Sequence, residues 1–149
     1  MKITDALRAE HIVFHNLFDH IEKRVPTLKN LHAVQAVTAV LEGVLEDHGK
    51  VEDELLMDPL EASLGHIGQL ENFHDEHEAI DLALRNIRSC RNLKKGKALL
   101  LVAVRLSRQH FDKEERVVFP LIEKQLKAKT LAALGARWAN QRDVSGTSE

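Results

Sequence analysis

The chain has 149 residues, of which 44% are hydrophobic and 30% charged, a composition typical of one soluble globular domain with a substantial core. Its net charge of −2, with both signs interspersed, gives no reason to expect a nucleic acid or a membrane as partner. A single cysteine, Cys90, excludes an intrachain disulfide and thiolate-rich zinc or iron–sulfur sites. We expect no transmembrane segment, no secretory signal and a cytoplasmic location.

The first half of the chain predicts two long helices. Apolar residues recur at helical spacing over about residues 5–25, where Thr4 is the expected N-cap and Pro26 the end. A second helix is predicted over about 31–62, and Pro59 is expected either to kink it or to end it early.

The second half repeats this arrangement. After a break at residues 63–68, helices are predicted over about 69–91 and about 97–127, the last one bent near Pro120. No alternating strand pattern appears. Four long helices with short connections predict an all-α fold, an up-down-up-down four-helix bundle with a short fifth C-terminal helix.

Three parts of the chain are expected on this pattern. The bundle should occupy residues 1–128, and a C-terminal helical segment capped by Thr130 should occupy 129–142, with Trp138 packed on the bundle or covering one end. The remaining residues, 143–149, are small and polar and are expected to form a disordered tail.

Each half of the chain carries the same set of possible metal ligands. His11 and His77 begin matching apolar patterns, and a His-x-x-x-Glu pair follows in each half. Residues four apart on a helix point from the same face. One His-x-x-x-Glu motif by itself is weak evidence of metal binding, but its duplication predicts a site for two metal ions. Its expected ligands are His11, His48, Glu52, His77, His110 and Glu114.

Helix geometry supports this set. Counted from the third connection, His77 lies about 15 residues back and His110 about 14 forward, so both should reach one height in the bundle at about 1.5 Å per residue. Imidazoles with carboxylates suit iron, manganese or zinc better than calcium or magnesium. His74 and His15, one turn from His77 and His11, are candidate additional ligands, and His15 could replace His11 if the first helix were shifted by a turn.

These motifs together resemble the hemerythrin-like domain, the His-His-Glu cation-binding family. The resemblance covers about residues 5–127 and is carried by Glu10-His11, His48-x-x-x-Glu52, Glu76-His77 and the segment from His110 to Glu115 with Phe119-Pro120-Leu121. It implies a centre of two non-haem irons that takes O2 at an open position. Glu52 and Glu114 would then bridge the two ions.

Two departures separate the chain from the oxygen-carrying hemerythrins. Those proteins have His-x-x-x-His on the third helix, whereas position 73 here is Phe and His74 lies three residues before His77. They also have a bridging Asp five residues after the fourth-helix His, whereas Glu114 follows His110 by four. Both departures favour the broader bacterial branch of the family over a dedicated oxygen carrier.

The function expected first is a binding protein that takes up O2 or NO reversibly or senses oxygen or redox state. A sensor without an output domain would act through a protein partner that the sequence does not identify. The alternative is a di-iron oxidase, or a protein of iron handling or iron-centre repair, of the ferritin-like class. The His-rich ligand set favours binding over catalysis. A zinc hydrolase is disfavoured because Asp81 stands where a His-Glu-x-x-His motif after His77 needs its second His.

Overall fold

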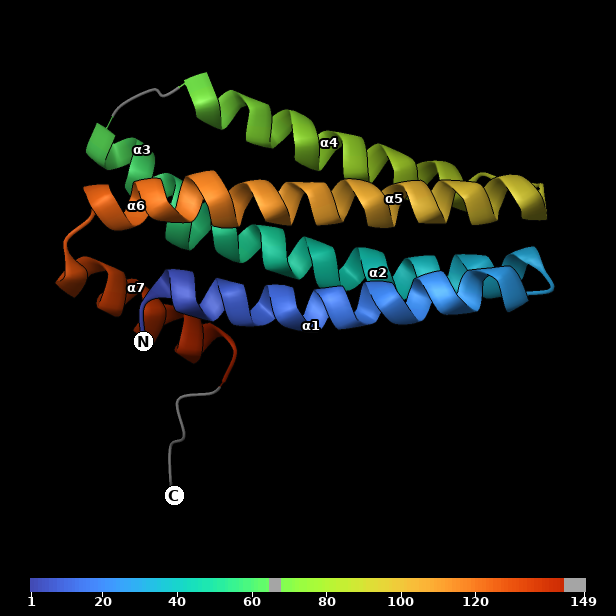
Figure 1. Ribbon diagram of the computed structural model, residues 1–149, viewed down its shortest axis with the longest axis horizontal. Coiled ribbons are helices and arrows are strands. Elements are labelled where there is room, and N and C mark those ends of the chain that lie inside the picture. Colours follow the sequence, from blue (N-terminus) through green and yellow to red (C-terminus); the bar gives the residue numbers. More distant parts are fainter. Residues whose placement is uncertain (65–67, 144–149) are drawn as a thin grey trace.

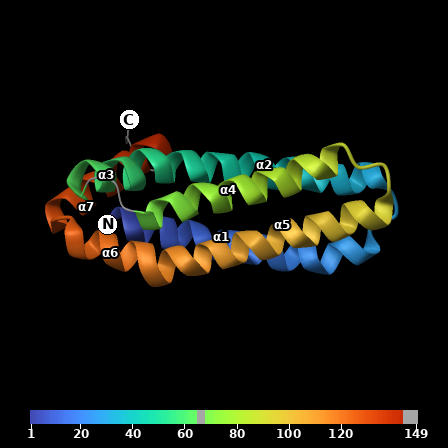
Figure 2. The same cartoon turned by 90° about the horizontal axis from the view of Figure 1, so that it is seen from above.

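A computed structural model describes the backbone of residues 1–64 and 68–143, and the side chains in these ranges outside residues 63–74. Four long helices lie along one another and alternate in direction (Figures 1 and 2): α1 (Ile3–Arg24), α2 (Leu31–Glu52), α4 (Gly68–Arg88) and α5 (Leu93–Lys113). The described part contains helices and turns but no strands, so the predicted all-α bundle is confirmed. No helix in this part is long and apolar enough to cross a membrane.

Shorter segments extend or connect the long helices. They are the 3₁₀ turn η1 (Val25–Thr27), the π-helical turns η2 (Asp53–Met57) and η3 (Glu114–Val118), and the helices α3 (Asp58–Leu64), α6 (Phe119–Gln125) and α7 (Ala128–Gln141). The break expected at 63–68 lies partly outside the described residues, and of the tail expected at 143–149 only Asp143 is described.

The two π turns are the main difference from the helices that the sequence predicts. The expected single helices over 31–62 and 97–127 are each interrupted several residues before the proline, not at Pro59 or Pro120. In each turn a backbone N–H bonds to the carbonyl five residues earlier, Asp58 to Asp53 and Phe119 to Glu114. Proline lacks an N–H and crowds the carbonyl four residues before it, so a wider turn ahead of it relieves the helix. Such turns are frequent at functional sites.

Three helix starts also differ from the prediction. The N-cap of α1 is Lys2, and the hydroxyl of Thr4 donates instead to Glu123 Oε1 at 2.7 Å. Helix α5 begins at Leu93 because the side chain of Asn92 accepts from the Lys95 N–H. The N-cap of α7 is Lys127, so Thr130 lies within the first turn of that helix.

The core consists of two apolar layers with a polar layer between them. On α1, Leu7 belongs to one layer and Phe14 to the other, and the buried His11 lies between them in the sequence. Glu114 is placed in the same way, between Phe111 of one layer and Val118 of the other. The fold therefore encloses its ionisable residues in the middle of the bundle.

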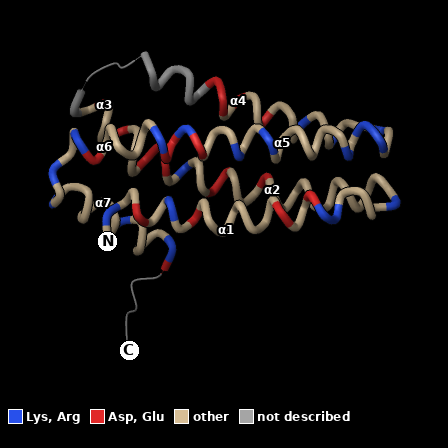
Figure 3. Tube along the Cα trace, in the orientation of Figure 1, with Lys and Arg blue, Asp and Glu red and all other residues tan. Residues whose placement is uncertain are grey.

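Helix α7 closes the end of the bundle where α1 begins (Figure 1). Its buried Leu131 and Leu134 join the apolar layer at that end, and Trp138 packs against this layer as expected. Both signs of charge occur along the bundle, with Lys and Arg predominating on α5 and Asp and Glu on α2 (Figure 3).

Candidate metal centre

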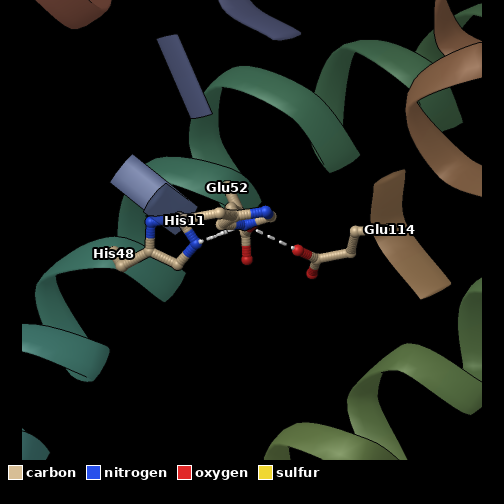
Figure 4. Close-up of side chains that lie close together, drawn as sticks. All are labelled: His11, His48, Glu52 and Glu114. Carbon is tan, nitrogen blue, oxygen red and sulfur yellow. Dashed lines mark hydrogen bonds and ion pairs between the residues drawn. The ribbon is translucent and has the colours of Figure 1, made fainter. Parts of the chain in front are cut away.

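Six of the eight residues predicted as ligands come together in the polar layer. They form two groups, in each of which four ligand atoms lie within 4.8 Å of one another. Figure 4 shows the first group, with side chains from α1, α2 and η3 turned toward one another. The first group is His11, His48, Glu52 and Glu114, and the second is Glu52, His77, His110 and Glu114. The two clusters are consistent with a dimetal centre.

The two glutamates belong to both groups, and each offers a different oxygen to each one. Glu114 places Oε2 3.1 Å from His11 Nε2 and Oε1 2.6 Å from His110 Nε2. Glu52 likewise places Oε1 3.1 Å from His48 Nε2 and Oε2 3.7 Å from His77 Nε2. Each carboxylate thus spans the space between the groups, which is the geometry of a bridging ligand.

The histidine nitrogens also converge in pairs. His11 Nε2 lies 3.2 Å from His48 Nε2, and His77 Nε2 lies 2.7 Å from His110 Nε2. Two neutral imidazoles cannot both turn an Nε2 lone pair to the same point without repulsion unless a proton or a cation lies between them. Each pair is therefore arranged to share a proton or a cation.

In three of these imidazoles the other ring nitrogen, Nδ1, contacts a carboxylate that the sequence did not lead us to assign to the site. His48 Nδ1 lies 2.6 Å from Glu10, His11 Nδ1 lies 2.9 Å from Glu115, and His110 Nδ1 lies 2.8 Å from Glu76. Such partners fix which ring nitrogen carries the proton and leave Nε2 free to bind a metal. The repeated dipeptides Glu10-His11 and Glu76-His77 were a signal for two of them.

The site is shielded from water on most sides. His11 is fully buried and its ring stacks on Phe111, with centroids 4.1 Å apart. Glu52 Oε1 and Glu114 Oε2 are buried and accept no hydrogen bond, although imidazole nitrogens lie 3.1 Å away. Burying carboxylate oxygens that accept no hydrogen bond is costly, and an ion pair offsets this cost only in part. A cation at this point would satisfy them, so the residues present fit a metal.

Without a metal, the carboxylates hold protons on the imidazoles. Burial by itself lowers the pKa of His11, but Glu114 and Glu52 outweigh it and raise that pKa to about 9. For His48 burial again opposes the shift, while Glu52 and Glu10 raise the pKa to about 10. Burial raises the pKa of Glu52, yet His48 and His11 hold it well below its usual range. The centre is thus an array of ion pairs whose protons a metal would displace.

The second group is open on one side. His77 is 28% exposed, whereas the other five side chains of the two groups are 3% exposed or less. A cavity of about 190 Å³ adjoins this side and reaches His77 and His110 between α2 and α4, where Gly49, Leu45 and Ile80 form part of its wall. A small molecule could approach the second group through it.

The remaining two predicted ligands have different outcomes. His15 belongs to neither group, because its Nδ1 lies 3.0 Å from Arg108 Nη1 in a surface network that includes Asp19 and Glu22. His15 therefore does not take the place of His11. The side chain of His74 lies outside the described residues.

Comparison with known families agrees with this geometry. A family model described as "Hemerythrin HHE cation binding domain" matches residues 2–122. The matched region contains all six clustered residues and ends before α7. No curated protein and no solved structure matches the chain.

Proposed function

The chain belongs to the hemerythrin HHE cation-binding family, and we propose that it holds two non-haem iron ions and binds O2 or NO reversibly, or senses oxygen or redox state through them. His11 and His48 would be terminal ligands of one iron, and His77 and His110 of the other. Glu52 and Glu114 would bridge the pair. His74, one turn before His77, is the proposed additional ligand on the open side.

The observation that carries this proposal is the division of each glutamate between the two groups. Glu114 directs Oε2 toward His11 and Oε1 toward His110, and Glu52 is divided in the same way between His48 and His77. A single ion would need one oxygen from each carboxylate and would leave the second histidine pair without a role. Two ions would give a partner to the Nε2 atoms of all four histidines and to all four carboxylate oxygens.

The donor types support iron. Mixed imidazole and carboxylate ligands suit iron, manganese or zinc, while calcium and magnesium prefer all-oxygen sites. Two irons held in this way would supply the electrons needed to bind O2 reversibly. The protein supplies the apolar surroundings, with Phe111 stacked against His11, that limit the access of water and of charged species.

The open side of the second group supports a small ligand. The cavity next to His77 has a volume of about 190 Å³, and Leu45, Ile80 and Phe111 form the apolar part of its lining. A diatomic molecule could reach the ion at His77 and His110 without displacing a protein ligand. A sensor of this kind would signal through a protein partner.

The decisive experiment is to measure iron per chain and to record the visible spectrum after anaerobic reduction and again after O2 is admitted. Two irons with a band that appears in air and disappears when O2 is removed would support the proposal. Two irons that oxidise irreversibly would favour the alternative, a di-iron oxidase or a protein of iron handling or iron-centre repair. One zinc, or no metal, would overturn the di-iron proposal.

A further inference from the structure

Helix α7 reaches back to the metal centre although it lies beyond the residues that match the family model. We propose that α7 is part of this centre, with Trp138 and Arg142 as positioning residues that hold Glu10 against the ring of His48. The inference rests on the proposed role of His48 as a metal ligand.

Glu10 lies between His48 and the C-terminal end of α7. Its Oε2 is 2.6 Å from His48 Nδ1, and its Oε1 accepts from Trp138 Nε1 and from Arg142 Nε, each at 2.8 Å. The Arg142 Nη2 atom also donates to Glu10 Oε2 at 3.4 Å and to the backbone carbonyl of Asp47 at 3.3 Å. Arg142 thus ties the carboxylate of Glu10 to the turn of α2 that carries His48.

The contact depends on close packing of α7 against the start of α1. A Cβ atom at Gly135 would collide with the carbonyl oxygen of Met1, so the two backbones approach as nearly as glycine allows. On the same helix Leu131 and Leu134 are buried in the apolar layer at this end of the bundle. These contacts determine where Trp138 and Arg142 lie.

The other half of the protein holds its equivalent carboxylate in a different way. Glu76, which lies behind His110, accepts from Lys113 Nζ at 2.6 Å, and Lys113 lies on α5, one turn after His110 itself. That contact is internal to the bundle. At His48 the contact comes instead from a helix outside the matched region, which makes His48 dependent on α7.

We expect faster metal loss when the hydrogen-bond donors of Trp138 and Arg142 are removed. Glu10 is 16% exposed, so without Trp138 and Arg142 its carboxylate can rotate toward water. The His48 ring would then lose the hydrogen bond that fixes its orientation and its tautomer. Partners of this kind typically change metal affinity by about 10- to 100-fold. We expect about ten-fold faster metal release, since here Glu10 itself is retained.

The test uses the full chain loaded with Zn²⁺, a diamagnetic probe. The double variant Trp138→Phe/Arg142→Met keeps the ring and the aliphatic stem but removes the donors to Glu10. Gln141→Ala is the matched control, because it removes a hydrogen bond between α7 and Glu54 that does not reach a proposed ligand. The readouts are the rate of Zn²⁺ transfer to excess chelator and the ¹H–¹⁵N signals of the imidazole Nδ1–H groups.

We expect about ten-fold faster Zn²⁺ release and a weakened His48 Nδ1–H signal in the double variant, with the His110 signal unchanged. Of the two single variants at this position, Arg142→Lys should release Zn²⁺ more slowly than Arg142→Met, because lysine keeps one charged donor. Equal release rates in the double variant and in Gln141→Ala would overturn the positioning role while the metal site remained. A wild-type chain that binds no Zn²⁺ and no iron would overturn the proposed function instead.

Discussion

His11 Nε2 and His48 Nε2 lie 3.2 Å apart, and the Nδ1 atom of each ring is turned away toward a carboxylate. Both imidazoles therefore direct their Nε2 atoms to one point in the centre of the bundle. In the metal-free protein that point must hold protons, and in a protein loaded with metal we expect it to hold the cation. Because protons and metal compete, the stability of the metal-free form and the stability that a metal adds to it should depend on pH in opposite directions.

The metal-free protein should be less stable at about pH 9 than at about pH 6. His11 and His48 have pKa values raised from 6.5 to about 9 and about 10 in the folded state, so the stability they contribute is complete below pH 6.5 and is lost as the pH rises through those values. The pKa of Glu10 is lowered to about 2, despite its burial, by hydrogen bonds from His48 and Arg142, so its contribution is present above about pH 4.5 and is lost as the pH falls toward 2. Urea unfolding across this range measures the effect.

The stability of the loaded protein should change little with pH between about 6.5 and 9. Metal binding requires the imidazoles to lose their protons, so the stability gained from the metal should increase with pH between about 6.5 and 9. The difference in urea midpoint between the loaded and metal-free forms is the quantity to compare. A metal-free protein that becomes more stable over this range would contradict protonated imidazoles in the folded state.

Removing a bridging carboxylate should remove metal while the helices remain. In Glu114→Ala both histidine pairs lose a proposed shared ligand, and we expect at most one metal ion per chain where we propose two for the wild type. The metal-free protein should lose stability, because Glu114 pairs with His11 and His110, but the helices should remain, since the two apolar layers are unchanged. Metal analysis and far-UV circular dichroism are the measurements, with Glu54→Ala, at an exposed position beside Glu52, as the control. Unchanged metal stoichiometry would refute the bridging role.

The carboxylates behind the histidines should differ in importance according to their burial. Glu10→Gln should weaken metal binding by about 10- to 100-fold, because the side chain is 16% exposed and lies 2.6 Å from His48. Glu115→Gln should have a smaller effect, since that side chain is 39% exposed and solvent screens its contact with His11. Competition titrations with a metal chelator would give both values. The reverse order would show that burial does not govern these contacts.

Filling the cavity should slow ligand entry without removing metal. A Cβ atom at Gly49 meets nothing within 4 Å, so Gly49→Leu can place its side chain in the cavity without disturbing the backbone. Gly43→Leu is the matched control, because Gly43 lies on the same helix with equally open surroundings but does not line the cavity. Each change removes a helical glycine and should stabilise α2 by about 0.5–1 kcal/mol.

Stopped-flow binding of NO to the reduced iron protein would measure entry. We expect a lower association rate in Gly49→Leu only, with iron content equal to wild type in both variants. Equal rates in the two variants would show that NO reaches the centre by another route.

The local pattern of the sequence was sufficient to predict the helical bundle and the residues that meet in its centre. The spacing of His48 to Glu52 and of His110 to Glu114 places each pair on one helical face, and the duplication of this pattern distinguished it from the similar spacing at His15 and Asp19. These features depend on helical periodicity and on turn residues. Both are local properties that involve residues only a few positions apart in the chain.

Other features depend on how helices distant in sequence are rotated against each other. Which oxygen of Glu114 faces His11, why His15 pairs with Arg108, and how Trp138 reaches Glu10 all follow from contacts between separate helices. The π turns before the prolines change that rotation partway along a helix, and no local pattern indicated them. The sequence by itself therefore determined the candidate ligand residues and the helices that carry them, whereas the tertiary structure decided the partner of each of their polar atoms, because such partners are fixed by packing between helices.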